Sequence, residues 1–126
     1  VVLLAIGIGD SPEDEAYIVD KTINMRIFPN SEGRFDRSIS DMSGELLLIS
    51  QFTLYGDTRK GRRPSFTGAA PPEIAAEQFA SVVERFRATG LSVKTGRFQA
   101  MMDVELVNDG PVTIVIDSTD RYRSRK

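Results

Sequence analysis

The sequence contains no cysteine, no histidine and no tryptophan among its 126 residues. Without cysteine there is no disulfide, no thiolate metal ligand and no cysteine nucleophile. The absence of histidine removes the commonest general base near neutral pH, the serine–histidine–aspartate triad and the usual zinc and non-haem iron ligand sets. Any catalysis by this chain must therefore work without imidazole, and we expect neither a metal nor a cofactor.

Long apolar runs are missing as well. No stretch approaches the roughly 20 apolar residues that span a bilayer, and the first residues lack the order of a secretory signal. We therefore expect a cytoplasmic protein without a membrane partner. The 16 basic and 18 acidic residues give a net charge of −2, which argues against broad non-specific nucleic-acid binding, and we expect no DNA partner.

The composition that remains is typical of one folded globular domain, with 40% hydrophobic and 27% charged residues. Residues 1–8 are almost continuously hydrophobic and predict a strand buried on both faces. Ser11 and Pro12 then predict a helix start, followed by acidic residues that favour the positive end of the helix dipole. Turn signals occupy residues 27–33 and 41–44.

The strongest predicted strand covers residues 46–49, and it is interrupted by Ser50 and Gln51 before apolar character resumes at 52–54. Burying either polar side chain without a partner would cost about 1 to 3 kcal/mol. A bulge or an edge strand with local hydrogen bonds explains this pair as well as a functional role does.

A second helix is predicted over residues 72–89, with Gly90 placed to end it. Its apolar stripe consists of Ala75, Phe79, Val82, Val83 and Phe86. Further strands are predicted at residues 91–93, 101–107 and 112–116. The turn between the last two favours a hairpin, although Pro111 cannot donate to the sheet ladder. This order of elements predicts an α+β or mixed α/β domain without internal repeats.

Short motifs of known chemistry are absent. No paired carboxylates, metal-ligand spacing or glycine-rich phosphate loop stands out. Two groups of basic residues do: Arg59, Lys60, Arg62 and Arg63 in one segment, and Arg121, Arg123, Arg125 and Lys126 at the end of the chain. From charge alone, a solvated loop explains the first group better than a phosphate site does. The second group is typical of a frayed tail.

Four longer strings carry a resemblance to a known family. They cover residues 50–54, 57–66, 95–98 and 106–113. In this order and with few gaps, over residues 1 to about 118, they resemble D-aminoacyl-tRNA deacylases. The family's Ser-Gln string and its Asn-x-Gly-Pro-x-Thr string are both intact. The resemblance implies a single deacylase domain over residues 1–118, with mixed sheets in a partly open barrel and two helices, followed by a basic tail at 119–126.

The resemblance also implies an activity, the hydrolysis of the ester of D-aminoacyl-tRNA, and of glycyl-tRNA for alanine, without a cofactor. The enzyme would be a homodimer with active sites at the subunit interface. In that family the Gly-Pro peptide is cis and enters the partner's site, so Gly110 and Pro111 would serve the other subunit. Their main-chain carbonyls would hold the substrate amino group and leave no room for an L side chain.

Further roles follow residue by residue from the same resemblance. The catalytic segment would be Ser50, Gln51, Phe52 and Thr53, with backbone N–H groups near Gln51 and Phe52 as oxyanion donors. Thr53 would be positional, because the sequence supplies no base to activate it. The Gly-Pro motif would be supported by Asn108 and Thr113. The remaining implied contacts are an adenosine pocket of Phe66, Phe98 and Met102, for which plain core packing is an equal explanation, and phosphate contacts from Arg59, Lys60, Arg62 and Arg63.

Two rival functions stay open at the level of sequence. One is the related deacylase that clears alanine from threonine tRNA or glycine from alanine tRNA, although that branch departs from the Ser-Gln and Gly-Pro signatures. The other is a non-catalytic tRNA-binding module. Members of the family usually carry further strands ahead of the point that matches Val1. Without those strands, a sheet edge would be exposed.

Overall fold

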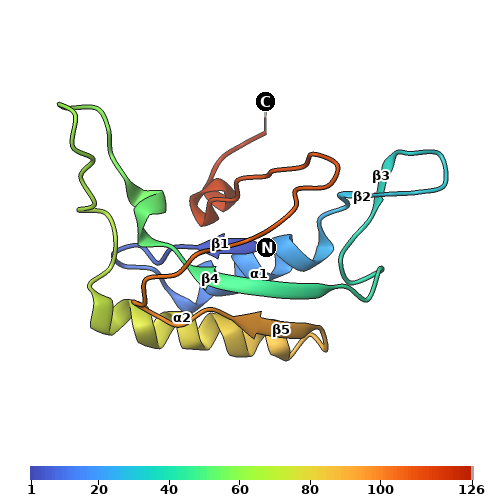
Figure 1. The fold of residues 1–126 in the computed structure, drawn as a ribbon, viewed down its shortest axis with the longest axis horizontal. Helices are drawn as coiled ribbons and strands as arrows, with labels where there is room; N and C mark the ends of the chain where they lie inside the picture. Colours follow the sequence, from blue (N-terminus) through green and yellow to red (C-terminus); the bar gives the residue numbers. More distant parts are fainter. Residues whose placement is uncertain (126) are drawn as a thin grey trace.

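The computed structural model describes residues 1–125, and its centre is a three-stranded parallel sheet (Figure 1). The strands β1 (Val2–Leu4), β4 (Glu45–Ser50) and β5 (Ser92–Thr95) lie in the order β1-β4-β5. A separate antiparallel hairpin pairs β2 (Phe28–Pro29) with β3 (Phe35–Arg37). Two α-helices, α1 (Pro12–Asn24) and α2 (Pro72–Arg87), complete the expected α+β class. The sheets stay open rather than closing into a barrel.

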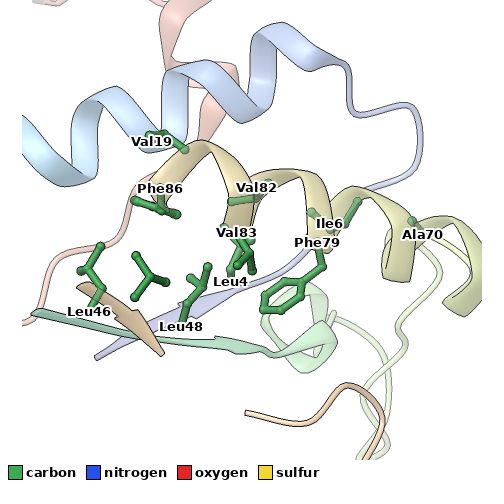
Figure 2. Packing of buried hydrophobic residues seen from close by; sticks show 11 residues of the cluster. Leu4, Ile6, Val19, Leu46, Leu48, Ala70, Phe79, Val82, Val83 and Phe86 are labelled. Atoms are coloured by element: carbon green, nitrogen blue, oxygen red, sulfur yellow. The ribbon is translucent and has the colours of Figure 1, made fainter. Parts of the chain in front are cut away.

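The core lies between the sheet and α2, which runs along one sheet face (Figure 2). Phe86 and Leu48 are fully buried there, and Val82 is 1% exposed. The apolar stripe predicted for this helix is confirmed, because every member is buried or packs against the core. The helix ends at Arg87, and Gly90 follows with a φ of +89° that a side chain would disfavour.

Helix α1 begins as the sequence predicts, with Ser11 as the N-cap and Pro12 in the first turn. The Ser11 N–H donates to Asp14 Oδ2 at 2.7 Å, and the Asp14 N–H donates to Ser11 Oγ at 3.4 Å. These two bonds form a capping box. The hydrogen bond from the Ser11 backbone is the main cause that lowers the pKa of Asp14 to about 2. None of the helices formed by residues 1–125 is long and apolar enough to cross a membrane.

Several predicted elements are wrong. The first strand covers only Val2–Leu4, and Leu3 is 46% exposed instead of buried. Residues 52–54 belong to a 3₁₀ helix, η1 (Phe52–Tyr55), not to a resumed strand. The turn expected over 27–33 includes β2, the first strand of the hairpin. There the Asn30 side chain accepts the N–H groups of Glu32 and Arg34 and shapes the connection.

The largest error concerns residues 101–117, where no strand forms. The segment has the alternation of apolar and polar residues that predicts strands, yet a strand also needs a neighbour for its backbone hydrogen bonds. No other described segment pairs with it, and Val107 and Val115 are each 90% exposed. It runs as a long extended loop beside the sheet (Figure 1).

The end of the chain is ordered where the sequence suggests fraying. Residues 118–122 form a second 3₁₀ helix, η2 (Ser118–Tyr122), which packs against α1. Arg121 Nη1 donates to Asp14 Oδ1 at 2.6 Å, and both side chains are largely buried. The predicted frayed tail is therefore wrong for this part of residues 119–126, because an ion pair to Asp14 in the first turn of α1 holds it. Lys126 lies outside the described residues.

Candidate active site

The carboxyl ends of the parallel strands define one edge of the sheet. Leu4 ends β1 and lies opposite Ser50, which ends β4. Thr95 ends β5 opposite Leu48, and the Gly96 N–H continues the ladder to the Leu48 carbonyl at 3.2 Å. Ligands of parallel sheets bind at this kind of edge. The Ser-Gln string leaves the sheet here, so the polar pair stands at the end of a strand and not in its middle.

The backbone after Ser50 is held by two hydrogen bonds of Gln51. Its N–H donates to the Leu4 carbonyl at 2.8 Å, and its side-chain amide donates to Thr53 Oγ1. The first bond corrects one expectation: the Gln51 N–H is already used inside the protein and is not a free oxyanion donor. Within residues 1–125, the N–H groups of Phe52 and Thr53 make no hydrogen bond. The free donors are therefore one residue further along than expected.

The three residues proposed for the adenosine pocket each contact a different part of the protein. Phe66 packs edge-on against Phe52, with ring centroids 5.2 Å apart. Phe98 packs against Phe79 of α2 at 6.1 Å and belongs to the rim of the core. The Met102 sulfur accepts the Arg97 N–H at 3.3 Å. Phe66 thus joins the Ser50–Thr53 segment, whereas neither of the two described cavities is lined by any of the three proposed residues.

The basic segment forms a projecting loop whose base is closed by Asp57 and Ser65. Their backbones exchange two hydrogen bonds, of 2.7 and 2.9 Å. Asp57 also pairs with Arg59 at 2.7 Å, and this bond lowers the pKa of the Asp57 carboxyl. Together with Lys60, these residues line a cavity of about 500 Å³. Four basic side chains of this loop are exposed: Arg59, Lys60, Arg62 and Arg63.

Asp57 is a residue that the sequence reasoning missed. Its Oδ1 accepts the Arg59 N–H at 3.0 Å, the arrangement of an Asx turn. An aspartate at the entry of a polar loop, two residues before a basic one, is the signal that could have identified it. Because Arg59 is paired and the other basic residues of the loop form no ion pair within residues 1–125, Lys60, Arg62 and Arg63 are the freer cations.

The Gly-Pro signature lies in an exposed turn of the extended segment. Asn108 Nδ2 donates to Thr113 Oγ1 at 3.1 Å, and the Val112 N–H donates to Asn108 Oδ1 at 3.2 Å. Gly110 has a φ of +138°, which disfavours residues with a side chain. No peptide bond among the described residues is cis, so the expected cis Gly110-Pro111 bond is not found in the isolated chain.

The two signature segments are not joined within one chain. No hydrogen bond links residues 108–113 to residues 50–53 in the described part of the protein. The site residues therefore fall into a sheet-edge group around Gln51 and Phe52 and a separate loop around Gly110. Among residues 1–125, no three acidic side chains converge in an arrangement that would hold a metal ion.

Comparison with known proteins places this geometry in a family. Residues 1–117 match the family described as D-Tyr-tRNA(Tyr) deacylase. A D-aminoacyl-tRNA deacylase of Roseiflexus sp. strain RS-1 is 58% identical over 118 residues, which are 94% of this chain and 76% of that protein. One from Desulfitobacterium hafniense is 53% identical over 122 residues, covering 97% of this chain and 82% of the relative.

Solved structures give the same answer for the fold. The protein named c-Myc DNA Unwinding Element Binding Protein superimposes with a TM-score of 0.82 at 39% identity, over 89% of this chain and 76% of that chain. A probable eukaryotic D-amino acid tRNA deacylase, 20% identical, matches with a TM-score of 0.53 over 68% of this chain and 50% of that one, which shows a shared fold alone. With the family match over almost the whole length, this chain belongs to the D-Tyr-tRNA(Tyr) deacylase family.

Proposed function

We propose that this protein is an aminoacyl-tRNA ester hydrolase that releases the free amino acid and tRNA from D-aminoacyl-tRNA. The observation that carries the proposal is the pair of free N–H groups, those of Phe52 and Thr53, at the carboxyl edge of the sheet. They lie in the Ser-Gln string, in a chain 58% identical to a protein named D-aminoacyl-tRNA deacylase. Fixed N–H donors stabilise the oxyanion formed during acyl transfer.

The proposed reaction needs no reactive side chain. Water adds to the carbonyl carbon of the ester, the carbonyl oxygen becomes an oxyanion, and the ribose oxygen leaves with a proton. The ester is intrinsically labile, and the neighbouring 2′-hydroxyl of the ribose assists the attack. The protein then contributes by positioning the ester and by donating hydrogen bonds to the oxyanion. This division of labour fits a chain without histidine.

Thr53 is assigned a positioning role in this scheme. Its hydroxyl accepts a hydrogen bond from the Gln51 side-chain amide, which is a donor and cannot take a proton from Thr53. A nucleophilic hydroxyl needs a base within hydrogen-bond reach. Within residues 1–125 no such base contacts it. Ser50 and Gln51 orient the same segment, through the end of β4 and the bond to Leu4.

Selection against L substrates is proposed to come from the backbone at Gly110 and Pro111, acting in the site of a second subunit. Support comes from the separation of this loop from the sheet edge within one chain, and from its exposed apolar neighbours. Leu106 is 53% exposed and Ile114 is 51% exposed. Exposed apolar surface of this kind is typical of an interface. Because the peptide is trans in the isolated chain, the proposal rests on the loop's carbonyls and not on the peptide isomer.

The remaining contacts follow from this substrate. Arg62 and Arg63, together with Arg59 and Lys60, would bind phosphates of the acceptor stem without reading its sequence. Phe66, next to Phe52, is the best placed of the proposed adenosine contacts, and Phe98 and Met102 complete that assignment. An exclusion filter against L side chains does not reject achiral glycine, so glycyl-tRNA for alanine is a second proposed substrate. Charged tRNA as substrate makes the cytoplasm the expected location.

The test is direct hydrolysis. The protein is incubated with D-Tyr-tRNA, L-Tyr-tRNA and Gly-tRNA(Ala), and loss of the ester is followed, with the molecular mass in solution measured by light scattering. We expect rapid loss of the D and glycyl esters by a dimer, and retention of the L ester. Binding of all three without hydrolysis would instead identify a tRNA-binding module. Hydrolysis of L-Ala-tRNA(Thr) in preference to D-Tyr-tRNA would identify the related editing deacylase.

A further inference from the structure

We propose that Tyr55 is a positioning residue for this reaction, because its ring anchors the turn η1 that presents the N–H groups of Phe52 and Thr53. Tyr55 is the last residue of η1, which begins at Phe52 directly after the Ser-Gln pair. None of the four residues of the turn is buried. Phe52 and Leu54 are 56% and 57% exposed, whereas Tyr55 is 38% exposed. The inference rests on the proposed function and adds a residue to its machinery.

The ring lies against two glycines that leave room for it. A Cβ on Gly7 would overlap the Tyr55 hydroxyl oxygen and lie 2.9 Å from Cζ, and a Cβ on Gly68 would lie 3.2 Å from Cδ1. Neither glycine has a positive φ, so glycine is needed at both positions for the room that it leaves and not for its backbone conformation. The two glycines belong to adjacent segments, because the Ile8 N–H donates to the Gly68 carbonyl at 3.0 Å. Their backbones form a fixed seat for the ring.

The turn transmits the position of the ring to the donors. The Leu54 N–H donates to the Gln51 carbonyl at 3.2 Å, and the Gly56 N–H donates to the Thr53 carbonyl at 3.0 Å. At its other end the turn is fixed through the Gln51 N–H on Leu4. Removing the Tyr55 ring would therefore take away the side-chain anchor of η1 and leave that end held only through the Asp57–Ser65 backbone pair beyond the turn. Oxyanion donors lose much of their effect when they can move, because their value lies in being preorganised.

The Tyr55 hydroxyl itself does no proton transfer in this proposal. Burial, and then the nearby carboxylates, with Asp10 first among them, raise the pKa of Tyr55 above its ordinary value. The hydroxyl therefore stays neutral and protonated through the physiological range and cannot act as a base. The ring, not the ionisable group, carries the function, so phenylalanine should replace it.

The first test compares Tyr55→Ala, Tyr55→Phe and the matched control Tyr17→Ala, which removes a partly buried ring from α1. With D-Tyr-tRNA, we expect Tyr55→Ala to lower kcat by about tenfold or more, with KM within about twofold, since a mobile donor loses transition-state and not ground-state binding. Tyr55→Phe should restore kcat, and Tyr17→Ala should leave it unchanged. Equal kcat for wild type and Tyr55→Ala, or an equal loss in Tyr17→Ala, would overturn the proposal.

Hydrogen exchange separates this inference from the proposed function. The amides of Leu54 and Gly56 should exchange faster in Tyr55→Ala than in wild type and in Tyr17→Ala. Unchanged exchange would overturn the anchoring role whatever the activity. If the wild-type protein hydrolyses no ester, the proposed function fails and the reaction role of Tyr55 fails with it, while faster exchange still establishes the anchor.

A double-mutant cycle tests the contact between the Tyr55 ring and Gly7. Gly7→Ala should displace the ring and reduce kcat in the same way as Tyr55→Ala. Once the ring is absent, the only neighbour that still crowds the added methyl group is Asp10 Oδ1, at 3.3 Å, so the double variant should be little worse than Tyr55→Ala alone. Additive losses in the double variant would show that Gly7 and Tyr55 act separately, and would overturn the claim that the Tyr55 ring is held by packing against Gly7.

Discussion

Asn108 and Thr113 close the turn that carries the Gly-Pro signature, through a hydrogen bond of 3.1 Å between Asn108 Nδ2 and Thr113 Oγ1. The same asparagine accepts the Val112 N–H at 3.2 Å. One side chain thus bridges both sides of Gly110 and Pro111 in a segment that has no strand to hold it. The conformation of the signature depends on this local brace rather than on a sheet ladder.

The first prediction concerns the brace. Asn108→Ala removes both hydrogen bonds and should lower kcat/KM for D-Tyr-tRNA by about 10-fold to 100-fold, because small misplacements of positioning groups carry costs of that size. Thr113→Val removes one bond and should have a smaller effect. Both side chains are exposed, so the midpoint of thermal unfolding should barely change. A large drop in that midpoint with parallel loss of activity would indicate a folding role instead.

The second prediction concerns Gly110. Its φ of +138° disfavours a side chain, and an added Cβ would lie 3.3 Å from Val112 Cγ2. Gly110→Ala should therefore shift the turn and slow hydrolysis of D-Tyr-tRNA. Gly33→Ala is the matched control, because Gly33 also has a positive φ and lies between β2 and β3, outside both signature strings. If Gly110→Ala hydrolysed both the D and the L ester at the wild-type rates, the proposed role of Gly110 in rejecting L substrates would be contradicted.

Local sequence signals predicted the core and the helices well. The stripe of α2 and the Ser11 cap depend on neighbours within a few residues, so period and capping chemistry suffice to identify them. The capping box was missed in part because Asp14 takes the place usually held by glutamate or glutamine. The 3₁₀ turn at Phe52–Tyr55 was missed because its apolar residues read equally well as a strand.

Long-range pairing was not predictable in the same way. The alternation over residues 101–117 is a strand signal, but whether it becomes a strand depends on a partner elsewhere. The contact between Arg121 and Asp14 joins residues 107 positions apart, and nothing local to either one signals it. The same holds for the site: both signatures were recognised from sequence, whereas the use of the Gln51 N–H by Leu4 required the geometry of the sheet.

The third prediction concerns tRNA binding by the basic loop. Arg62→Gln combined with Arg63→Gln should make the logarithm of the binding constant depend less steeply on the logarithm of salt concentration, by about 0.7 to 0.9 for each phosphate that the loop no longer neutralises. The matched control is Arg34→Gln, an exposed arginine by the β2–β3 hairpin. Binding of uncharged tRNA at several salt concentrations gives the slope directly. An unchanged slope would mean that the loop is merely solvated.

The fourth prediction concerns stability at low pH. The pKa of Asp14 is lowered from 3.8 to about 2, chiefly by the Ser11 backbone N–H, so the folded state favours its charged form. The resulting stabilisation is complete above the ordinary value of about 4 and is lost as the pH falls through about 2. Asp14→Asn should therefore cost about 1 to 2 kcal/mol of unfolding free energy at neutral pH.

Denaturant unfolding of wild type and Asp14→Asn across pH 2 to 7 measures this difference. The difference should shrink steadily below about pH 4. Protonation of Asp14 in the wild type removes the same stabilising negative charge that the Asp14→Asn substitution removes. Glu13→Gln, an exposed residue in the same turn of α1, is the matched control for net charge. A difference that stays constant down to pH 2 would mean that the capping box stabilises the helix through its shape, and not through the charge of Asp14.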